Sequence, residues 1–152
     1  MILPDVNVLL YAVDEASESH PRARDWLERS LSGTQTVAFA WSVLTAFIRL
    51  STRPAVFAQP LTVAQAVDLV EGWLAQPPVV VVHPTDRHLA ILRDLLEAAG
   101  TAGNLVPDAH LAALAIEHGA TVASSDRDFA RFAGVRSSDP IAGGTPPRYS
   151  AE

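Results

Sequence analysis

The pattern of hydrophobic and polar residues predicts alternating helices and strands along the chain. Over residues 109–116 apolar residues recur every three to four positions, which is typical of a helix, and Gly119 is placed to end it. Residues 121–123 form a short apolar run that predicts a buried strand. Ser125 with Asp128 three residues later fits a capping box, so a further helix is expected to begin there.

The rest of the sequence continues this alternation. Short apolar runs predict strands at residues 2–3, 36–40 and 79–82, and helical periodicity predicts helices at residues 7–13, 20–31, 41–51, 62–73 and about 85–99. Residues 79–82 are four consecutive valines, which is typical of a fully buried central or parallel strand. A short edge strand is expected near Val135 and Arg136.

Strands that alternate with helices predict an α/β fold. We expect a three-layer α/β/α domain, with a parallel sheet of four to five strands and helices on both faces. At 152 residues the chain fits one domain, which we place at residues 1–136, followed by a C-terminal tail at residues 137–152.

The composition narrows the possible functions. Because cysteine is absent, disulfides, thiolate metal sites and thiol nucleophiles are excluded, and a reducing cytoplasm is compatible. No secretory signal is expected, since the N-terminus lacks a basic segment, and polar residues interrupt the uncharged stretch 30–48 too often for a membrane span. The 49% share of hydrophobic residues suggests that a partner covers some apolar surface. A net charge of -6 argues against general affinity for nucleic acid but not against a nuclease that gathers carboxylates around cations.

Three acids are expected to meet at one edge of the predicted sheet. In parallel sheets, functional side chains lie beyond the carboxyl ends of the strands. Asp5 follows the first predicted strand, and Asp126 follows the strand at residues 121–123. Asp108 lies in the first turn of the helix before that strand, and the start of such a helix lies over the strand's carboxyl end.

Three neighbouring carboxylates repel one another, and a hard divalent cation removes that cost. Mg²⁺ or Mn²⁺ prefers oxygen ligands and, when bound, helps water to attack a phosphodiester. We therefore predict Asp5, Asp108 and Asp126 as metal ligands and catalytic residues. Asn7 could orient a carboxylate or a water, and Ser124 could support Asp126 as a hydrogen-bond donor.

Each acid also has a purely structural interpretation. Asp126 with Ser125 and Asp128 can serve only to cap a helix, and Asp5 can cap the helix that follows it. Asp108 lies in a helix first turn, where an acid complements the helix dipole without any chemistry. The convergence of all three on one edge favours a functional site over three separate caps.

The histidines and arginines indicate function less clearly. His83 and His88 are five residues apart and His110 and His118 eight apart, so neither pair has the spacing of a helical zinc site, and surface or capping roles are expected. Scattered arginines could contact phosphates but are more typical of a solvated face; they are Arg49, Arg53, Arg127, Arg131 and Arg136. The sequence has neither a glycine-rich phosphate loop nor a serine nucleophile elbow.

Three short stretches follow one another between residue 2 and about residue 136. They are Asp-Val-Asn beginning at Asp5, Asn-Leu-Val-Pro-Asp ending at Asp108, and Ser-Ser-Asp-Arg-Asp-Phe at residues 124–129. These stretches are similar to the Asp-x-Asn, third-acid and Thr-x-Asp-x-Asp-Phe motifs of the PIN-domain family. Within that family the chain resembles the VapC-type ribonuclease toxins of bacterial toxin-antitoxin pairs.

This resemblance implies a PIN-like fold and a Mg²⁺- or Mn²⁺-dependent endoribonuclease that cuts structured RNA, such as tRNA or rRNA, and halts growth. It also implies a cognate VapB-type antitoxin that occludes the site, a homodimeric toxin and a cytoplasmic location. By position, Asp5 and Asp108 would be the primary metal ligands, Asp126 an additional ligand and Asp128 a supporting residue.

The sequence departs from the family at one position. Many relatives carry Glu in the helix after the second strand, and alignment on Phe47 and Arg49 puts Leu44 where that acid would be. One carboxylate is therefore missing, and one metal ion held by Asp5 and Asp108 is favoured over two.

Two other functions are compatible with parts of the pattern. A PIN fold that has lost catalysis with its Glu would act only through protein or RNA contacts, although the retained Asp5, Asp108 and Asp126 disfavour this. A phospho-receiver also gathers acids around Mg²⁺ at strand ends. It would need an acceptor Asp where His83 follows the valine strand, and a lysine to contact the phosphoryl group, and the chain has no lysine.

Overall fold

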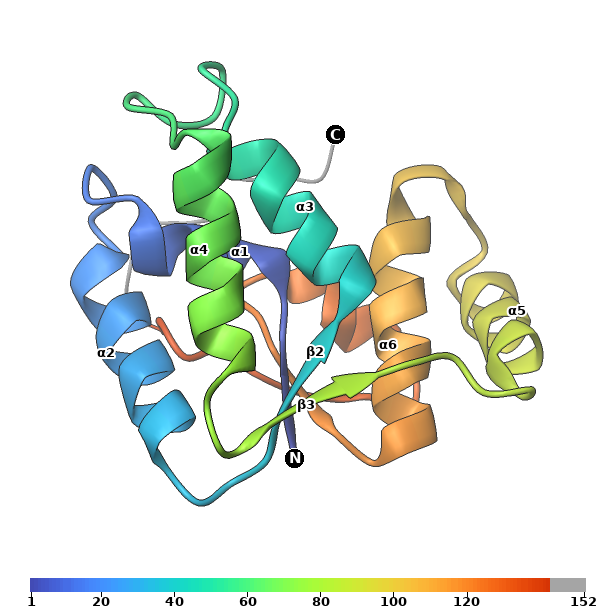
Figure 1. Cartoon of the computed structure of the whole chain (residues 1–152). Coiled ribbons are helices and arrows are strands. Elements are labelled where there is room, and N and C mark those ends of the chain that lie inside the picture. Colours follow the sequence, from blue (N-terminus) through green and yellow to red (C-terminus); the bar gives the residue numbers. More distant parts are fainter. Residues whose placement is uncertain (143–152) are drawn as a thin grey trace.

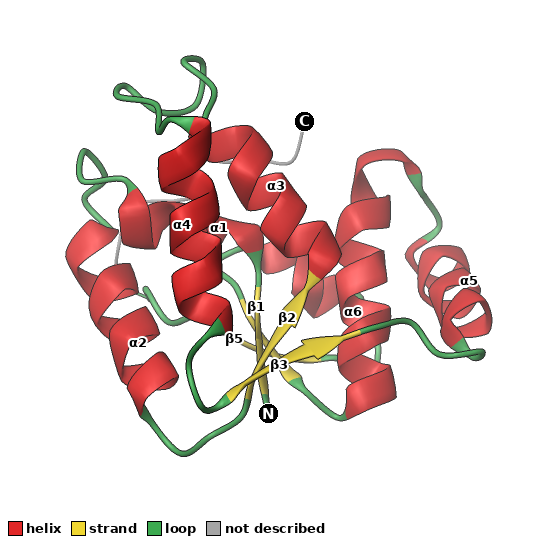
Figure 2. Cartoon of the chain, viewed as in Figure 1, coloured by secondary structure: helices red, strands yellow, loops and turns green. Residues whose placement is uncertain are grey.

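A single parallel sheet forms the centre of the molecule. The computed structural model describes residues 1–142, so most of the predicted C-terminal tail, residues 143–152, lies outside the described residues. Five strands lie in the order β3-β2-β1-β4-β5, all parallel (Figure 2). They are β1 (Ile2–Pro4), β2 (Val37–Ala40), β3 (Val79–Val82), β4 (Thr121–Ala123) and β5 (Arg136–Ser138). The predicted parallel sheet is confirmed, and the predicted domain end at residue 136 falls inside β5.

Six α-helices in the described part of the chain flank the sheet, which confirms the three-layer α/β/α fold (Figure 1). They are α1 (Val6–Val13), α2 (His20–Ser32), α3 (Trp41–Ser51), α4 (Val63–Leu74), α5 (His88–Ala99) and α6 (Val106–His118). Helix α1 packs against α2 and α3, and α3 packs against α4, whereas α5 lies on the outer side of α6. None of these helices is long and apolar enough to cross a membrane.

The position of β3 corrects one prediction. Because β3 is hydrogen-bonded only to β2, at one end of the sheet, it is not a central strand. Val80 is 41% exposed, and Val82 is the only buried residue of the strand. Four β-branched residues favour a strand wherever they lie, but this preference does not reveal where in the sheet the strand is placed.

Helix α6 carries apolar residues around most of its circumference because it is packed from two sides, by β4 and by α5. Its buried residues are Ala109 and residues 111–115. Pro107 lies in its first turn, and Gly119 ends it with a φ of 65°, a conformation that favours glycine. These two residues fix the ends of α6, so the position of Asp108 relative to the sheet is well defined.

The segment after β4 differs from the prediction. The expected α-helix is a 3-10 helix, Arg127–Arg131, and its N-cap is Asp126 instead of Ser125. The side chain of Asp126 accepts a hydrogen bond from the backbone N–H of Asp128 at 2.8 Å, which starts the turn one residue later than expected. The next strand, β5, begins only a few residues after this turn, so the chain has little room for a longer helix.

Candidate active site

The structure brings the three predicted acids to the carboxyl edge of the sheet. Asp5 directly follows β1 and caps α1, with its Oδ1 accepting a hydrogen bond from the Val6 N–H at 2.7 Å. Asp126 follows β4, and Asp108 lies in the first turn of α6. All three line one cavity. The capping interpretation of Asp5 and Asp126 is therefore also correct, because a side chain that caps a helix can line the cavity as well.

Three carboxylates lie closest to one another: Asp108, Asp126 and Asp128. Each offers an oxygen atom, and these atoms all lie within 4.8 Å of one another, which is a spacing that a single cation could bridge. The sequence indicated Asp128 only as a supporting or capping residue. Asp5 is outside this group of three. Its negative charge nevertheless raises the pKa of Asp108, so Asp5 lies near enough to interact with the same group of acids.

Ser124 connects the first and the last of the predicted acids. Its Oγ donates to Asp5 Oδ2 at 2.7 Å and accepts from the Asp126 backbone N–H at 2.9 Å. Ser124 thus supports Asp126, but as an acceptor and not as the predicted donor, because its proton is directed to Asp5. Ser124 therefore orients one acid through its side chain and the other through its backbone.

Asn7 completes the hydrogen bonds of Ser124 and leaves one acceptor without a partner. Its Nδ2 lies 3.2 Å from Ser124 Oγ. A hydroxyl group has only one proton, and that of Ser124 is used by Asp5, so Asn7 must be the donor in this contact. Asn7 Oδ1 is then the remaining polar atom, and it is buried without a hydrogen-bond partner in the described structure. A buried acceptor of this kind favours a ligand or a water at the site.

Burial and like charges raise the pKa of two of the acids. The pKa of Asp5 rises to about 6, mainly because the side chain is buried; the hydrogen bonds from Ser124 and Val6 counteract this in part. The pKa of Asp108 rises to about 7, again chiefly through burial and then through the negative charges of Asp5, Asp126 and Asp128. The site therefore favours an additional positive charge, which either protons or a metal cation can supply.

The cavity beside these acids has a volume of about 190 Å³ and lies between α3 and α6. Its remaining wall is mostly aliphatic and comprises Val6, Val43, Ala46, Leu50, Pro107 and Leu111. Ser42, Arg49, Gly103 and Asn104 add polar or backbone groups to the lining. A cavity with apolar walls next to carboxylates suits a ligand that has both an apolar part and a charged part.

The position of Leu44 differs from the alignment. Leu44 is fully buried in the core and does not line the cavity. Helix α3 faces the cavity through Ala46 and Arg49 among others, because positions two apart on a helix point in very different directions. Leu44 is therefore not the position from which an acid would reach the site. The conclusion that α3 supplies no carboxylate still holds, since its sequence contains neither Asp nor Glu.

A second cavity adjoins the first. It shares Asp108 and Asp126 with the first cavity and adds Asp128 and Arg131. Arg131 Nη1 lies 3.5 Å from Asp128 Oδ1, and both side chains are 46% exposed, so this ion pair is weak and open to competition from a ligand. Asp108 and Asp126 thus line both cavities, and each cavity has one arginine in its lining.

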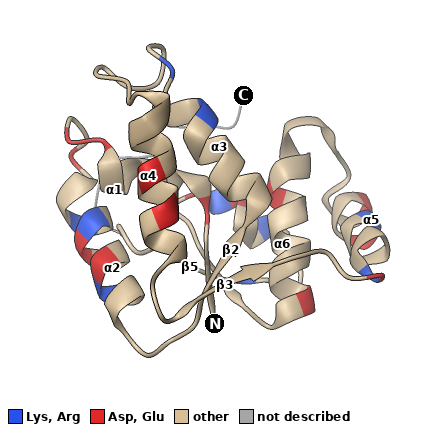
Figure 3. Cartoon of the chain, viewed as in Figure 1, with Lys and Arg blue, Asp and Glu red and all other residues tan. Residues whose placement is uncertain are grey.

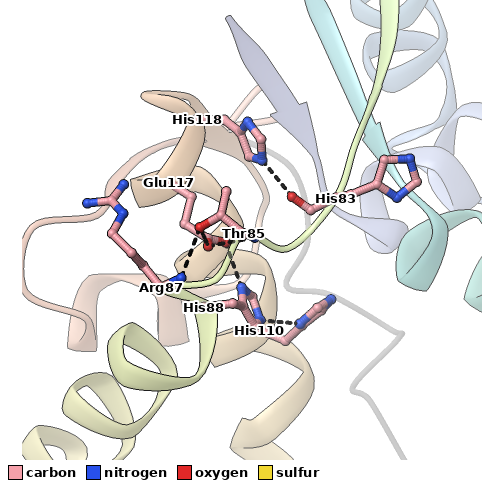
Figure 4. Close-up of polar contacts among 7 residues, drawn as sticks. All are labelled: His83, Thr85, Arg87, His88, His110, Glu117 and His118. Atoms are coloured by element: carbon pink, nitrogen blue, oxygen red, sulfur yellow. Dashed lines mark hydrogen bonds and ion pairs between the residues drawn. The ribbon is translucent and has the colours of Figure 1, made fainter.

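Two histidines form a polar network that the sequence did not reveal (Figure 4). His88 Nδ1 lies 2.6 Å from Glu117 Oε2, and His88 Nε2 lies 2.8 Å from His110 Nδ1. The Thr85 backbone N–H donates to Glu117 Oε1 at 2.9 Å. Surface or capping roles were thus the wrong prediction for His88 and His110, which join α5 to α6. The available signal was the seven-residue spacing of His110 and Glu117, which puts them on one helix face.

This network is separate from the carboxylates, since none of its residues lines the two cavities. Burial and the neighbouring His88 lower the pKa of His110. Burial raises the pKa of Glu117, but hydrogen bonds from Thr85 and His88 outweigh it and the pKa is lowered overall. A role in packing α5 onto α6 accounts for these contacts.

Comparisons with known proteins identify the family. The PIN domain family matches residues 2–135. The chain is 51% identical over 142 residues to ribonuclease VapC37 of Mycobacterium tuberculosis, covering 93% of this chain and 99% of that protein. It is 42% identical over 141 residues to ribonuclease VapC33 of the same species, again covering 93% and 99% of the two chains.

Solved structures share the fold at lower identity. VapBC2 from Rickettsia felis, bound to a DNA fragment from its promoter, has a TM-score of 0.66 at 20% identity and covers 91% of this chain and 98% of that one. VapC20 of Mycobacterium tuberculosis, a toxin that cleaves the sarcin-ricin loop, has a TM-score of 0.64 at 19% identity, with coverage of 90% and 99%. The chain therefore belongs to the PIN-domain family and, within it, to the VapC ribonucleases.

Proposed function

We propose that this protein is a metal-dependent endoribonuclease that hydrolyses phosphodiester bonds in structured RNA, such as tRNA or rRNA, as the toxin of a type II toxin-antitoxin pair. The observation that carries the proposal is the cluster of acids with raised pKa values at the edge of the sheet, in a chain that belongs to the VapC ribonucleases. Among the described residues, no cationic side chain forms an ion pair with Asp5, Asp108 or Asp126, which is expected of a site built to hold a cation.

The residues of the site fit Mg²⁺ or Mn²⁺. Both ions prefer oxygen ligands, and the lining offers the carboxylates of Asp5, Asp108 and Asp126, with Asp128 close by. The unpartnered Asn7 Oδ1 supports this assignment, because Mg²⁺ usually keeps several water molecules and a buried acceptor can hold one of them. Soft-metal chemistry is disfavoured, since the chain has no cysteine.

When bound, the cation would lower the pKa of a water molecule and stabilise negative charge on the phosphate oxygens. The chain's own residues hold the acids in place for this. Ser124 and the Val6 N–H fix the two oxygens of Asp5, and the Asp128 N–H fixes Asp126. We propose a single ion, because α3 brings no acid to the cavity and the clustered carboxylates Asp108, Asp126 and Asp128 form one group.

Contact with the RNA backbone falls to individual arginines, because basic residues are spread over several elements, and those on α2 are interspersed with acids (Figure 3). Arg49 lines the first cavity and Arg131 the second, so each could contact a phosphate next to the one at the acids. This arrangement agrees with the net charge of -6, which provides little long-range attraction to RNA.

The proposal includes a VapB-type antitoxin, a homodimer and a cytoplasmic location, as expected of a VapC toxin. Exposed apolar side chains support contacts with other protein surfaces; Trp41 is 49% exposed and Leu89 69% exposed.

The test is incubation of the purified protein with total tRNA and rRNA in Mg²⁺, in Mn²⁺ and in EDTA. We expect discrete cleavage products with either ion and none with EDTA. Absence of cleavage under every condition, or equal cleavage in EDTA, would contradict the proposal. Retained RNA binding without cleavage would favour the alternative of a catalytically weak PIN-fold binding module.

A further inference from the structure

We propose that the cavity between α3 and α6 is a subsite for one nucleobase of the RNA, next to the phosphate that binds at the carboxylates. This inference rests on the proposed function and adds to it the part of the substrate that the cavity recognises. It follows from four properties of the cavity: its size, its walls, its rim and its direct continuity with the acids.

The size of the cavity fits a single ring system. Pockets for drug-sized ligands commonly enclose about 300–1,000 Å³. A cavity of about 190 Å³ lies below this range, and it suits one base enclosed by the aliphatic walls, with the phosphate at the end that Arg49 and the acids line. The base must therefore be turned out of any stacked helix, as bases in loops and bulges of structured RNA can be.

The walls of the cavity match the faces of a base. Val43 and Leu50 on α3 and Leu111 on α6 supply aliphatic surface. A nucleobase has two apolar faces and a polar edge, so burial of the faces against aliphatic groups is favourable. A phosphate would gain nothing from such walls, because it is polar on all sides, and a ribose would gain less than a base, because hydroxyl groups interrupt its C–H surface.

The rim of the cavity provides polar groups for the edge of the base. Ser42 and Asn104 line the cavity and are exposed, and their side chains make no hydrogen bond within the described part of the protein. Each can therefore pair with the donors and acceptors of a base without first breaking a contact. An amide such as Asn104 can donate and accept at once, as the edge of a base requires.

The charge around the cavity indicates that a phosphate lies beside the buried group. Arg49 is the one cationic side chain among the lining residues, and it is exposed and free of any ion pair in the described structure. The acids line the same cavity on the α6 side. A base in the cavity would thus have its own phosphate between Arg49 and the acids, which is where a cleavable bond must lie.

The experiment compares ligands with and without a base. Binding of AMP, GMP, CMP, UMP and ribose 5-phosphate to the full chain in Mg²⁺ is measured by NMR titration or calorimetry. Ala46→Leu fills the cavity from α3, where Ala46 is part of the wall. Thr45→Leu is the matched control. Thr45 is next to Ala46 in the sequence, but its side chain is exposed and does not line the cavity.

We expect at least one nucleotide to bind wild type and Thr45→Leu about tenfold more tightly than ribose 5-phosphate does, and Ala46→Leu to lose this difference. Equal binding of all five ligands, no binding at all, or unchanged discrimination in Ala46→Leu would overturn the inference. These results are independent of the cleavage assay. RNA cleavage without base discrimination would overturn the subsite and support the nuclease function. Base discrimination without cleavage would support the subsite and contradict the nuclease function.

Discussion

Ser124 donates its hydroxyl proton to Asp5 at 2.7 Å, across a sequence separation of 119 residues. This hydrogen bond joins the end of β4 to the end of β1, two strands that are neighbours at the centre of the sheet. It also opposes the effect of burial on Asp5, since it favours the ionised form of the carboxylate.

Removal of this hydroxyl group should weaken the site without unfolding the protein. In Ser124→Ala the pKa of Asp5 should rise above its present value of about 6, because the hydrogen bond that lowers it is lost. Supporting hydrogen bonds around metal ligands typically contribute about 10–100-fold to metal affinity, and we expect a loss of this order for Mn²⁺, measured by titration. Ser30→Ala is the control: this hydroxyl donates to the Trp26 backbone oxygen within α2 and lines neither cavity beside the acids, so Mn²⁺ affinity should not change.

Asp108→Asn should abolish metal-dependent RNA cleavage and leave the fold intact. The substitution keeps the size of the side chain but removes the charge that would hold the cation. Cleavage of total RNA in Mg²⁺ and circular dichroism of the same samples provide the two readouts. Asp94→Asn, on the exposed side of α5, should retain activity. Full activity of Asp108→Asn would refute the assignment of this residue.

The same variant should be more stable than the wild type when metal is removed, and increasingly so as the pH rises. The pKa of Asp108 is raised from 3.8 to about 7, so the ionised form destabilises the folded state. The contribution of protonated Asp108 to the stability of the folded state is therefore complete below pH 4 and is lost as the pH rises through 7. Because Asp108 is only partly buried, we expect a gain of about 1–3 kcal/mol for Asp108→Asn at pH 8 in EDTA.

The measurement is urea denaturation of both proteins at pH 4 and pH 8 in EDTA. The comparison between two proteins cancels the titration of groups that do not interact with Asp108, such as His110. A constant difference between pH 4 and pH 8 would contradict the assigned pKa. Addition of Mg²⁺ should remove the advantage of Asp108→Asn, because the cation stabilises only the carboxylate form.

His88→Ala should destabilise the protein without affecting the chemistry of the site. The side chain of Glu117 is 0% exposed, and it would lose the imidazole that lies 2.6 Å away. Loss of a partner for a buried polar group costs about 1–3 kcal/mol. Urea denaturation should show this loss, while cleavage per folded molecule should remain unchanged. His83→Ala is the control, since His83 is exposed and only its backbone oxygen accepts from His118 at 2.8 Å.

The local order of helices and strands, and the residues that converge on one edge, were determined by the sequence itself. Alternating periods predicted a parallel α/β sheet, and in such a sheet the acids after β1 and β4 must share an edge with the start of α6. Helix α3 and the strand β3 were predicted with the bounds that the structure has. These features depend on local propensity and on chain direction, both of which are written in the sequence.

Only the tertiary structure decided which atoms meet. It placed β3 at the edge, turned Leu44 into the core and Ala46 toward the cavity, and directed the proton of Ser124 to Asp5. It also joined His88 and Glu117, which lie 29 residues apart. The order of strands and the rotation of each helix are set by how all side chains pack together, so no short stretch of sequence contains them.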